Sequence, residues 1–360
     1  MKQYEDFANL LINSNGAVPI YNCLLHINNE NIDYKIAVGQ IGNSKEKLLH
    51  NSRFRTGSIT KIFTATIILQ LMEKNLLNLE DNFFDLLQSN ELKQLASEIL
   101  FFDGINYSTQ IKVKDLLHHK SGLRDYYSDD ERFFAHIKKN PNQKWNYKIV
   151  LKKYFEFDLH KKGVSKPNEL FYYSDTNYLL LAILIEEVTN KKYHKVLEEN
   201  ILKPLSLHDT YLEFHQHKKG NTPIIFPYHG TYSLKNTNTS FDWGGGGLIS
   251  STEDLTVFIR SLFTGKLFTD KKTLQKMMNF EDCAIDAIPK KRNIDYGIGL
   301  QRKKIGKHNY IGHNSAYGGM AFYNLETGTS FILTINQVLA PHKAEWLLKK
   351  SVEAFFSNEY

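Results

Sequence analysis

The chain is poor in cysteine, which argues against two common ways of holding a small protein together. Its 360 residues include only two, Cys23 and Cys283, which stand far apart and belong to no Cys-x-x-Cys or Cys/His spacing. Neither a zinc site nor a disulfide framework is therefore expected, and both thiols are predicted to be reduced.

Long apolar runs are also missing. No stretch approaches the roughly eighteen uncharged apolar residues that a membrane span needs. The first residues, MKQYEDFANLLINSNG, contain acids and no continuous apolar segment. The sequence as given thus predicts no membrane span and no signal peptide, which favours a cytoplasmic protein. A leader removed beforehand would leave a similar sequence, so a periplasmic or secreted protein is the alternative.

Neither basic nor acidic residues strongly outnumber the other kind. The 45 basic and 39 acidic residues are interleaved and give a net charge of +6, with basic spots such as Lys161-Lys162 only a few residues long. Such a pattern is typical of a solvated surface, and we expect no nucleic-acid partner. The 42% of hydrophobic residues suffice for one large domain or two lobes.

Several functional motifs are absent or incomplete. No Gly-x-Ser-x-Gly elbow exists, which argues against an α/β-hydrolase. The glycine run 244–247 lacks the Lys-Ser/Thr of a phosphate loop and is predicted to be a loop near the edge of an active site. The pairs His118-His119 and His215-x-His217 lack a third metal ligand, so we expect polar surface positions or, for His118, a packed helix position.

Strand signals gather at the two ends of the chain. Residues 2–13 favour a helix, and two strand-like runs at 18–27 and 34–40 predict an antiparallel hairpin. A meander is expected from the short β-rich runs at the other end, which are 296–303, 308–313, 318–324 and 329–337, before a final helix at 342–356. Ser251, followed by Thr252, Glu253 and Asp254, predicts a helix start.

The middle of the chain, from about 76 to 240, has mostly helical periodicity, including a long run at 178–202. The fold class is therefore α/β (α+β), an antiparallel sheet flanked by helices and built from both termini, with an inserted, mostly helical lobe. We expect a single catalytic domain, 1–360, with an α/β lobe at about 1–75 and 241–360 and a helical lobe at about 76–240.

The segment RTGSITKIFTATIILQLMEKNLL predicts a buried helix that carries an amine near its start. Ser58 and Lys61 are three residues apart and share a helix face. Burial and the positive helix end both disfavour the charged amine, which predicts a lowered pKa for Lys61. A neutral Lys61 could accept the Ser58 proton and make the hydroxyl a nucleophile. The alternative is that Ser58 caps the helix and Lys61 reaches water.

Seven segments along the chain carry a family resemblance, and they are RTGSITKIFTATIILQLMEKNLLNLED, IKVKDLLHHKSGLRDYY, FYYSDTNYLLLAILIEEVT, LKPLSLHDTYL, GGGGLISSTEDLTVFI, YGIGL and IGHNSAYGGMAFYN. In this order they resemble the segments of the serine β-lactamases and penicillin-binding proteins, in which Ser-x-x-Lys is the first motif. The similarity is closest to the class C-like branch of DD-peptidases, esterases and D-aminopeptidases.

The resemblance implies a role for each matched position. Ser58 would be the acylated nucleophile and Lys61 its base. Tyr173 would match the Tyr-x-Asn tyrosine that relays protons between nucleophile and leaving group; as a phenolate it would need cationic neighbours such as Lys61 or His313. His313 would match the basic residue of the third motif and hydrogen-bond the Tyr173 oxygen or a substrate carboxylate.

Four further positions would contact substrate or the oxyanion: Asp175, Asn314, Ser315 and Ala316. The backbone N–H groups of Ser58 and Ala316 would form the oxyanion hole. Asp175 stands where the family usually has asparagine; it would favour a charged Lys61 and could suit a substrate with a free amine. Ser315 replaces a glycine and predicts a narrower cleft.

The resemblance thus implies a serine hydrolase that needs no metal or cofactor and cleaves an ester or amide, whose substrate is a small ester, a D-amino-acid peptide or a β-lactam-like molecule. The alternative is a degenerate member that keeps the fold and acts as a binding or scaffold protein. The partner is a small-molecule or peptide substrate, and the sequence leaves the oligomeric state open.

Overall fold

The computed structural model describes residues 2–14, 18–42, 46–218, 220–280 and 295–357, so Cys283 lies outside the described residues. Its described strands form a seven-stranded antiparallel sheet in the order β11 (Asp295–Tyr296), β12 (Gln301–Ile305), β13 (His308–Asn314), β14 (Gly319–Asn324), β15 (Thr329–Thr334), β1 (Asn22–Asn28) and β2 (Asp33–Gly39). β1 pairs with β2 and also with β15, where Leu24 faces Thr334. The predicted hairpin and meander are confirmed, and they share one sheet.

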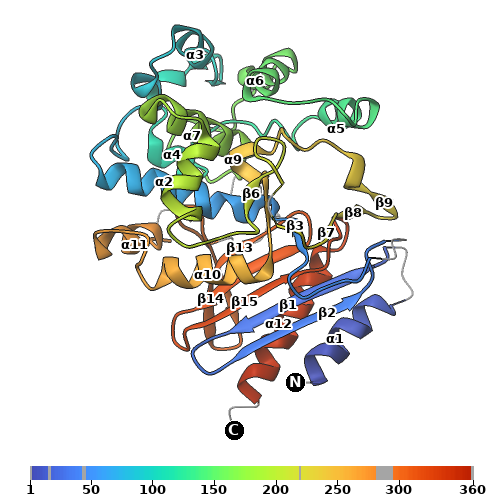
Figure 1. Cartoon of the computed structure of the whole chain (residues 1–360). Coiled ribbons are helices and arrows are strands. Elements are labelled where there is room, and N and C mark those ends of the chain that lie inside the picture. Colours follow the sequence, from blue (N-terminus) through green and yellow to red (C-terminus); the bar gives the residue numbers. More distant parts are fainter. Residues whose placement is uncertain (1, 15–17, 43–45, 219, 281–294, 358–360) are drawn as a thin grey trace.

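Helices cover both faces of this sheet (Figure 1). α1 (Lys2–Ile12) and α12 (Pro341–Ser357) pack on one face, and α10 (Thr252–Phe263) packs on the other. Successive strand residues point to opposite faces, so Leu25 joins the core under α1 and α12 while Leu24 joins the core on the α10 side. The Ser251 side chain accepts a hydrogen bond from the Asp254 N–H, as the predicted helix start requires.

The middle of the chain is mostly helical. Its helices are α2 (Thr60–Glu73), α3 (Asn90–Ala96), α4 (Val113–Leu117), α5 (Glu131–Lys139), α6 (Tyr147–Glu156), α7 (Asp175–Thr189) and α8 (Tyr193–Leu197), followed after α10 by α11 (Lys271–Met277). Short helical turns are η1 (Gly57–Ile59), η2 (Phe83–Leu86), η3 (Ser108–Gln110), η4 (Leu159–Lys161), η5 (Glu198–Leu202) and η6 (Leu234–Asn236). The long helical run at 178–202 is broken because Asn190 adopts a left-handed backbone, with φ of 52°.

A second, four-stranded sheet lies between the first sheet and the helices, and the sequence did not indicate it. Its order is β6 (Tyr211–Leu212), β10 (Leu248–Ser250), β3 (Arg53–Arg55) and β7 (Ile224–Ile225). Strands of two or three residues are too short to show an alternating pattern. Two short hairpins complete the strands, β4 (Phe101–Phe102) with β5 (Ile105–Asn106) and β8 (Tyr228–His229) with β9 (Tyr232–Ser233).

The glycine run is a short helix, α9 (Trp243–Gly246), and the predicted loop is wrong. A Cβ on Gly244 would lie 2.5 Å from the Ala182 Cβ of α7, and one on Gly245 would lie 3.3 Å from an Asp175 oxygen. The missing side chains therefore let α9 lie directly against α7 and beside Asp175. The prediction that this run borders the candidate site agrees with that position.

Among the described residues, no helix is both long and apolar enough to cross a membrane. Cys23 is a buried free thiol, and burial raises its pKa to about 12, so it is protonated.

Candidate active site

Ser58 lies at the point where the second sheet gives way to a helix. β3 ends at Arg55, the turn η1 follows, and α2 begins at Thr60, so Ser58 precedes the α-helix and Lys61 is the second residue of α2. Gly57 has a φ of 52°, which favours glycine, and this tight turn presents Ser58 with part of its surface exposed. The Lys61 Nζ is fully buried and lies 3.1 Å from the Ser58 Oγ.

Lys61 has a hydrogen-bond acceptor for each of its three protons within the described residues. Besides the Ser58 Oγ, its Nζ contacts the carbonyl oxygen of Gly245 at 2.8 Å and the Oδ1 of Asp175. An ammonium group has three donors and no acceptor. The surroundings of Lys61 are therefore those of a charged amine, with Asp175 as its counterion.

The predicted lowering of the Lys61 pKa is wrong. Burial does act in that direction, but the negative charge of Asp175 and the hydroxyl of Tyr173 outweigh it, and the pKa of Lys61 is raised above its ordinary value. The alternative in which Lys61 reaches water is also wrong, because the side chain is fully buried.

Tyr173 lies in the loop before α7, with its ring centroid 5.0 Å from the Lys61 Nζ. Burial raises the pKa of Tyr173 to about 12, although Lys61 and Ser58 both act to lower it. The residue is therefore a neutral phenol at neutral pH, and the phenolate considered from the sequence is not favoured. A phenol can donate a proton to a leaving group.

His313 lies on β13, and its two ring nitrogens are already occupied. The Nδ1 is 2.6 Å from the carbonyl oxygen of Asn314, and the Nε2 is 3.1 Å from the Tyr296 hydroxyl. Among the described residues, the partners of the His313 nitrogens are thus Asn314 and Tyr296 and not the predicted Tyr173 oxygen, and the predicted contact with a substrate carboxylate stays a prediction. Burial, with a smaller effect of Lys61, lowers the pKa of His313 to about 3, so it is not a cation.

Two residues that the sequence did not assign to the site belong to this cluster, His119 and Tyr296. The Tyr296 hydroxyl lies 3.2 Å from the His119 Nε2 as well as 3.1 Å from the His313 Nε2. His119 was expected at the surface, but it is fully buried, and its ring stands 4.3 Å from that of Tyr173. The expectation failed because His118-His119 has no periodicity that distinguishes the two positions.

The hydrogen-bond partners of the His119 and His313 rings determine which ring nitrogen carries the proton. The His119 Nδ1 accepts from the backbone N–H of Ser174, at 3.2 Å, so its Nε2 carries the proton and donates to Tyr296. The His313 Nδ1 donates to a carbonyl, so its Nε2 accepts from Tyr296. The result is a neutral, directional chain from His119 through Tyr296 to His313.

Two further carboxyl groups lie near Asp175, of which Asp125 is buried and Asp242 is half-buried. The Oδ1 of Asp125 accepts from the Asp175 backbone N–H at 3.0 Å, and the Oδ2 of Asp242 accepts from the Tyr317 hydroxyl at 2.5 Å. Burial and the charge of Asp175 raise the pKa of both groups to about 7. The site therefore has an excess of acidic groups beside a single ammonium among the described residues.

Besides Asp175, the predicted substrate-facing positions are the last residue of β13, Asn314, and the two residues after it, Ser315 and Ala316. The Ser315 hydroxyl accepts from the Tyr317 N–H at 3.1 Å and points at Gly57, where a Cβ would lie only 2.3 Å from it. Ser315 is buried against the turn η1, while Asn314 is partly exposed and Ala316 is exposed. Within the described residues, no carbonyl accepts from the Ala316 N–H, which agrees with a role for this donor in binding an oxyanion.

In the described part of the chain, no group of three or more His, Cys, Asp or Glu side chains could hold a metal ion.

The chain belongs to the Beta-lactamase family, whose model matches residues 34–353. Protein flp of Staphylococcus aureus (strain MRSA252) is 29% identical over 219 residues, which are 60% of this chain and 40% of that protein. Penicillin-binding protein 4* of Bacillus subtilis (strain 168) is 31% identical over 170 residues, 46% of this chain and 32% of that protein. The chain thus spans less than half of the length of these curated relatives.

Solved structures share the fold. The D-stereospecific amidohydrolase from Streptomyces sp. superposes with a TM-score of 0.79 at 23% identity, covering 95% of this chain and 96% of its own. The D-amino acid amidase from Ochrobactrum anthropi SV3, complexed with L-phenylalanine amide, gives a TM-score of 0.79 at 19% identity, covering 100% of both chains. The resemblance and the fold class predicted from the sequence are confirmed.

Proposed function

We propose that the protein is a serine hydrolase that cleaves an ester or amide through an acyl-enzyme on Ser58. The observation that carries the proposal is the 3.1 Å contact between the Ser58 Oγ and the buried Lys61 Nζ, with the hydroxyl on the partly exposed side of the cluster. A nucleophile must be both reachable by substrate and in contact with a group that can take its proton. In this proposal, residues 1–360 act as one catalytic domain.

The reaction follows from these positions. The Ser58 oxygen attacks the acyl carbon as its proton leaves toward Lys61, and the N–H groups of Ser58 and Ala316 bind the oxyanion that forms. Tyr173, a phenol, donates its proton to the departing alcohol or amine, which breaks the ester or amide bond. Water then attacks the acyl-enzyme and gives one proton to the Tyr173 phenolate, and Ser58 regains the proton that it passed toward Lys61 as the acid leaves.

A substrate with a free amine is favoured by the acidic groups of the site. Burial and the charge of Asp175 raise the pKa of Asp125 and Asp242 to about 7, and a cationic substrate beside them would favour the charged forms of both carboxyl groups. The amidase and amidohydrolase of similar fold are named for D-amino-acid or D-stereospecific substrates. Comparing D-amino-acid peptides with free and blocked amino termini tests this preference, and equal rates on both would exclude it.

Intact-protein mass spectrometry tests the nucleophile. After exposure to a fluorophosphonate or a penicillin, we expect a single covalent adduct on the wild type and none on Ser58→Ala. A wild type that stays unmodified by both probes would favour the alternative function, a binding or scaffold protein that keeps the fold. p-Nitrophenyl esters, nitrocefin and D-alanyl substrates would then rank the reaction types.

A further inference from the structure

The three acceptors around Lys61 differ in what they can do with a proton. The Ser58 hydroxyl is the group to be deprotonated, and the Gly245 carbonyl accepts hydrogen bonds but is not a base at neutral pH. Asp175 is a carboxylate, which becomes a neutral acid by binding one proton. Among the described residues that contact the Lys61 amine, it is the group able to take a proton from it.

The other groups near the amine have no such capacity in the resting protein. Tyr173 is a neutral phenol, and the imidazole nitrogens of His119 and His313 are engaged with other partners. An ammonium cannot accept the Ser58 proton unless it first loses one of its own. Lys61 can therefore accept the Ser58 proton if its partner Asp175 takes a proton from the amine.

We propose that Asp175 is the terminal proton acceptor of acylation, with Lys61 as a relay between it and Ser58. The proposal rests on the acyl-enzyme mechanism given above. As the Ser58 oxygen attacks the acyl carbon, its proton passes to the Lys61 Nζ, and a different Nζ proton passes to the Asp175 Oδ1. The amine ends as an ammonium, the carboxylate ends as a carboxylic acid, and the negative charge moves to the substrate oxyanion.

The asparagine usual at this position could not do this, because an amide accepts hydrogen bonds without becoming a neutral acid. Asp175 thus adds a proton acceptor at a position where the usual asparagine has none. Other titratable groups face the Lys61–Asp175 pair from each packed element, and they are Asp125, Asp242, Tyr126, Tyr127, Tyr173, Tyr178, His119 and His313.

The pH dependence of acylation distinguishes this relay from a mechanism in which Lys61 first loses a proton to water and then accepts the proton of Ser58. We would measure the second-order rate constant for fluorophosphonate labelling of wild type and Asp175→Asn from pH 5 to 10. With the relay, the wild-type rate is flat through the neutral range. In Asp175→Asn, the amine loses the carboxylate that raises its pKa, and the Ser58 proton can end only on a neutral Lys61, so the labelling rate follows the titration of Lys61, rising about tenfold per pH unit below its pKa and levelling off above it.

Two matched measurements keep the result interpretable. Glu253→Gln removes a carboxylate from an ion pair with Lys35 on another face and should leave the labelling profile unchanged. Thermal unfolding of Asp175→Asn reports whether the variant folds. If it does not, the wild-type profile still decides, because a wild-type rate that climbs tenfold per pH unit above pH 7 would overturn the relay.

The outcomes distinguish the two proposals. A folded Asp175→Asn that labels at the wild-type rate, with the same flat profile, overturns the role of Asp175 and leaves the Ser58 acyl-enzyme standing. A wild type that does not label at any pH removes the proposed function, and the relay with it. A labelling rate that climbs with pH in Asp175→Asn and stays flat in the wild type supports both.

Discussion

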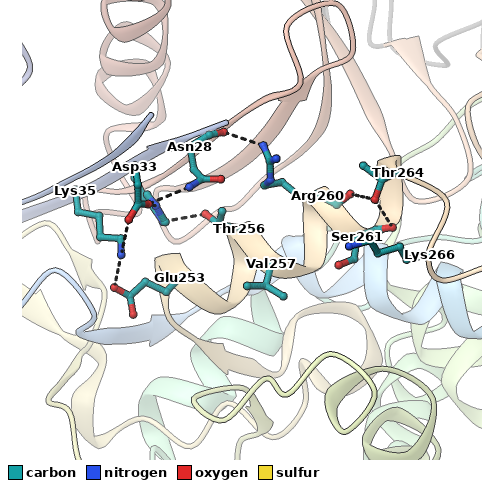
Figure 2. A pocket seen from close by; sticks show the side chains of 11 residues that line it. Asn28, Asp33, Lys35, Glu253, Thr256, Val257, Arg260, Ser261, Thr264 and Lys266 are labelled. Atoms are coloured by element: carbon teal, nitrogen blue, oxygen red, sulfur yellow. Dashed lines mark hydrogen bonds and ion pairs between the residues drawn. The ribbon is translucent and has the colours of Figure 1, made fainter. Parts of the chain in front are cut away.

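Two regions of the molecule contain the same three kinds of group, a hydroxyl, a base and a carboxylate. In the candidate site they are Ser58, Lys61 and Asp175. Beside α10, the Thr256 hydroxyl lies 2.9 Å from the His26 Nδ1, and the His26 Nε2 lies 2.6 Å from the Asp33 Oδ1. This second cluster lines a cavity of about 480 Å³ between α10 and the first two strands (Figure 2).

The two clusters differ in which group faces solvent. Thr256 is only 4% exposed and also hydrogen-bonds the Thr252 carbonyl of its own helix at 2.8 Å, whereas Asp33 is 56% exposed. In the candidate site the hydroxyl is the partly exposed member. A substrate could thus reach Ser58 but not Thr256, and the second cluster joins α10 to β1 and β2. Residue types alone do not make a nucleophile.

The charges differ as well. Burial lowers the pKa of His26, so the base of the second cluster is neutral, while Asp175 keeps Lys61 charged. The hydrogen bond from His26 is the main cause that lowers the pKa of Asp33 to about 2. Of these two clusters, only the candidate site therefore combines a partly exposed hydroxyl with a buried ammonium and its carboxylate.

Removing the amine should have the largest effect. Lys61→Ala deletes the group that contacts the Ser58 Oγ, so we expect fluorophosphonate labelling to slow by about 10²-fold to 10⁴-fold. Mass spectrometry against time measures the rate, and thermal unfolding shows whether the variant stays folded without the counterion of Asp175. Labelling at the normal rate would remove Lys61 from the mechanism.

Breaking the neutral histidine chain should have a smaller effect. Tyr296→Phe removes the hydroxyl between His119 and His313, which leaves a buried donor and a buried acceptor without this partner. We expect a loss of about 1–3 kcal/mol in unfolding free energy and a lower kcat on a p-nitrophenyl ester. Urea unfolding and steady-state rates test this, and an unchanged stability and kcat would show that the chain has no such role.

Acid should destabilise the fold through its buried histidines. Burial lowers the pKa of His26, His119 and His313, so the unfolded chain binds more protons than the folded one below its ordinary histidine pKa of about 6.5. The stability each contributes is complete above that pH and is lost as the pH falls below it, by up to about 1 kcal/mol per pH unit. We expect His313→Gln to flatten this slope between pH 6.5 and 4, measured by urea unfolding. An equal slope would contradict a neutral, buried His313.

The smallest effect is expected at the second cluster. Thr256→Val keeps the shape of the side chain and removes its hydroxyl, so α10 should lose about 1 kcal/mol of stability or less. Fluorophosphonate labelling should match the wild type. A strong loss of labelling would show that the two clusters are not independent.

Much of the fold could be predicted because it depends on local patterns. The hairpin of β1 and β2, the meander from β12 to β15 and the start of α10 each have an alternation, turn or cap that the sequence displays. The second sheet and the helix α9 could not, since their strands and turns are two to four residues long. Their conformation depends on contacts with distant segments such as α7.

The sequence by itself determined the family, the fold class and the pairing of Ser58 with Lys61, because a three-residue spacing at a helix start fixes which side chains are neighbours. It could not determine charge states. Asp175 is more than a hundred residues from Lys61, yet it reverses the direction of the Lys61 pKa expected from burial. Likewise His119, Tyr296 and His313 meet only in the folded chain, and hydrogen-bond partners fix which ring nitrogens hold protons. Burial and electrostatics act through space, so only the tertiary structure decided them.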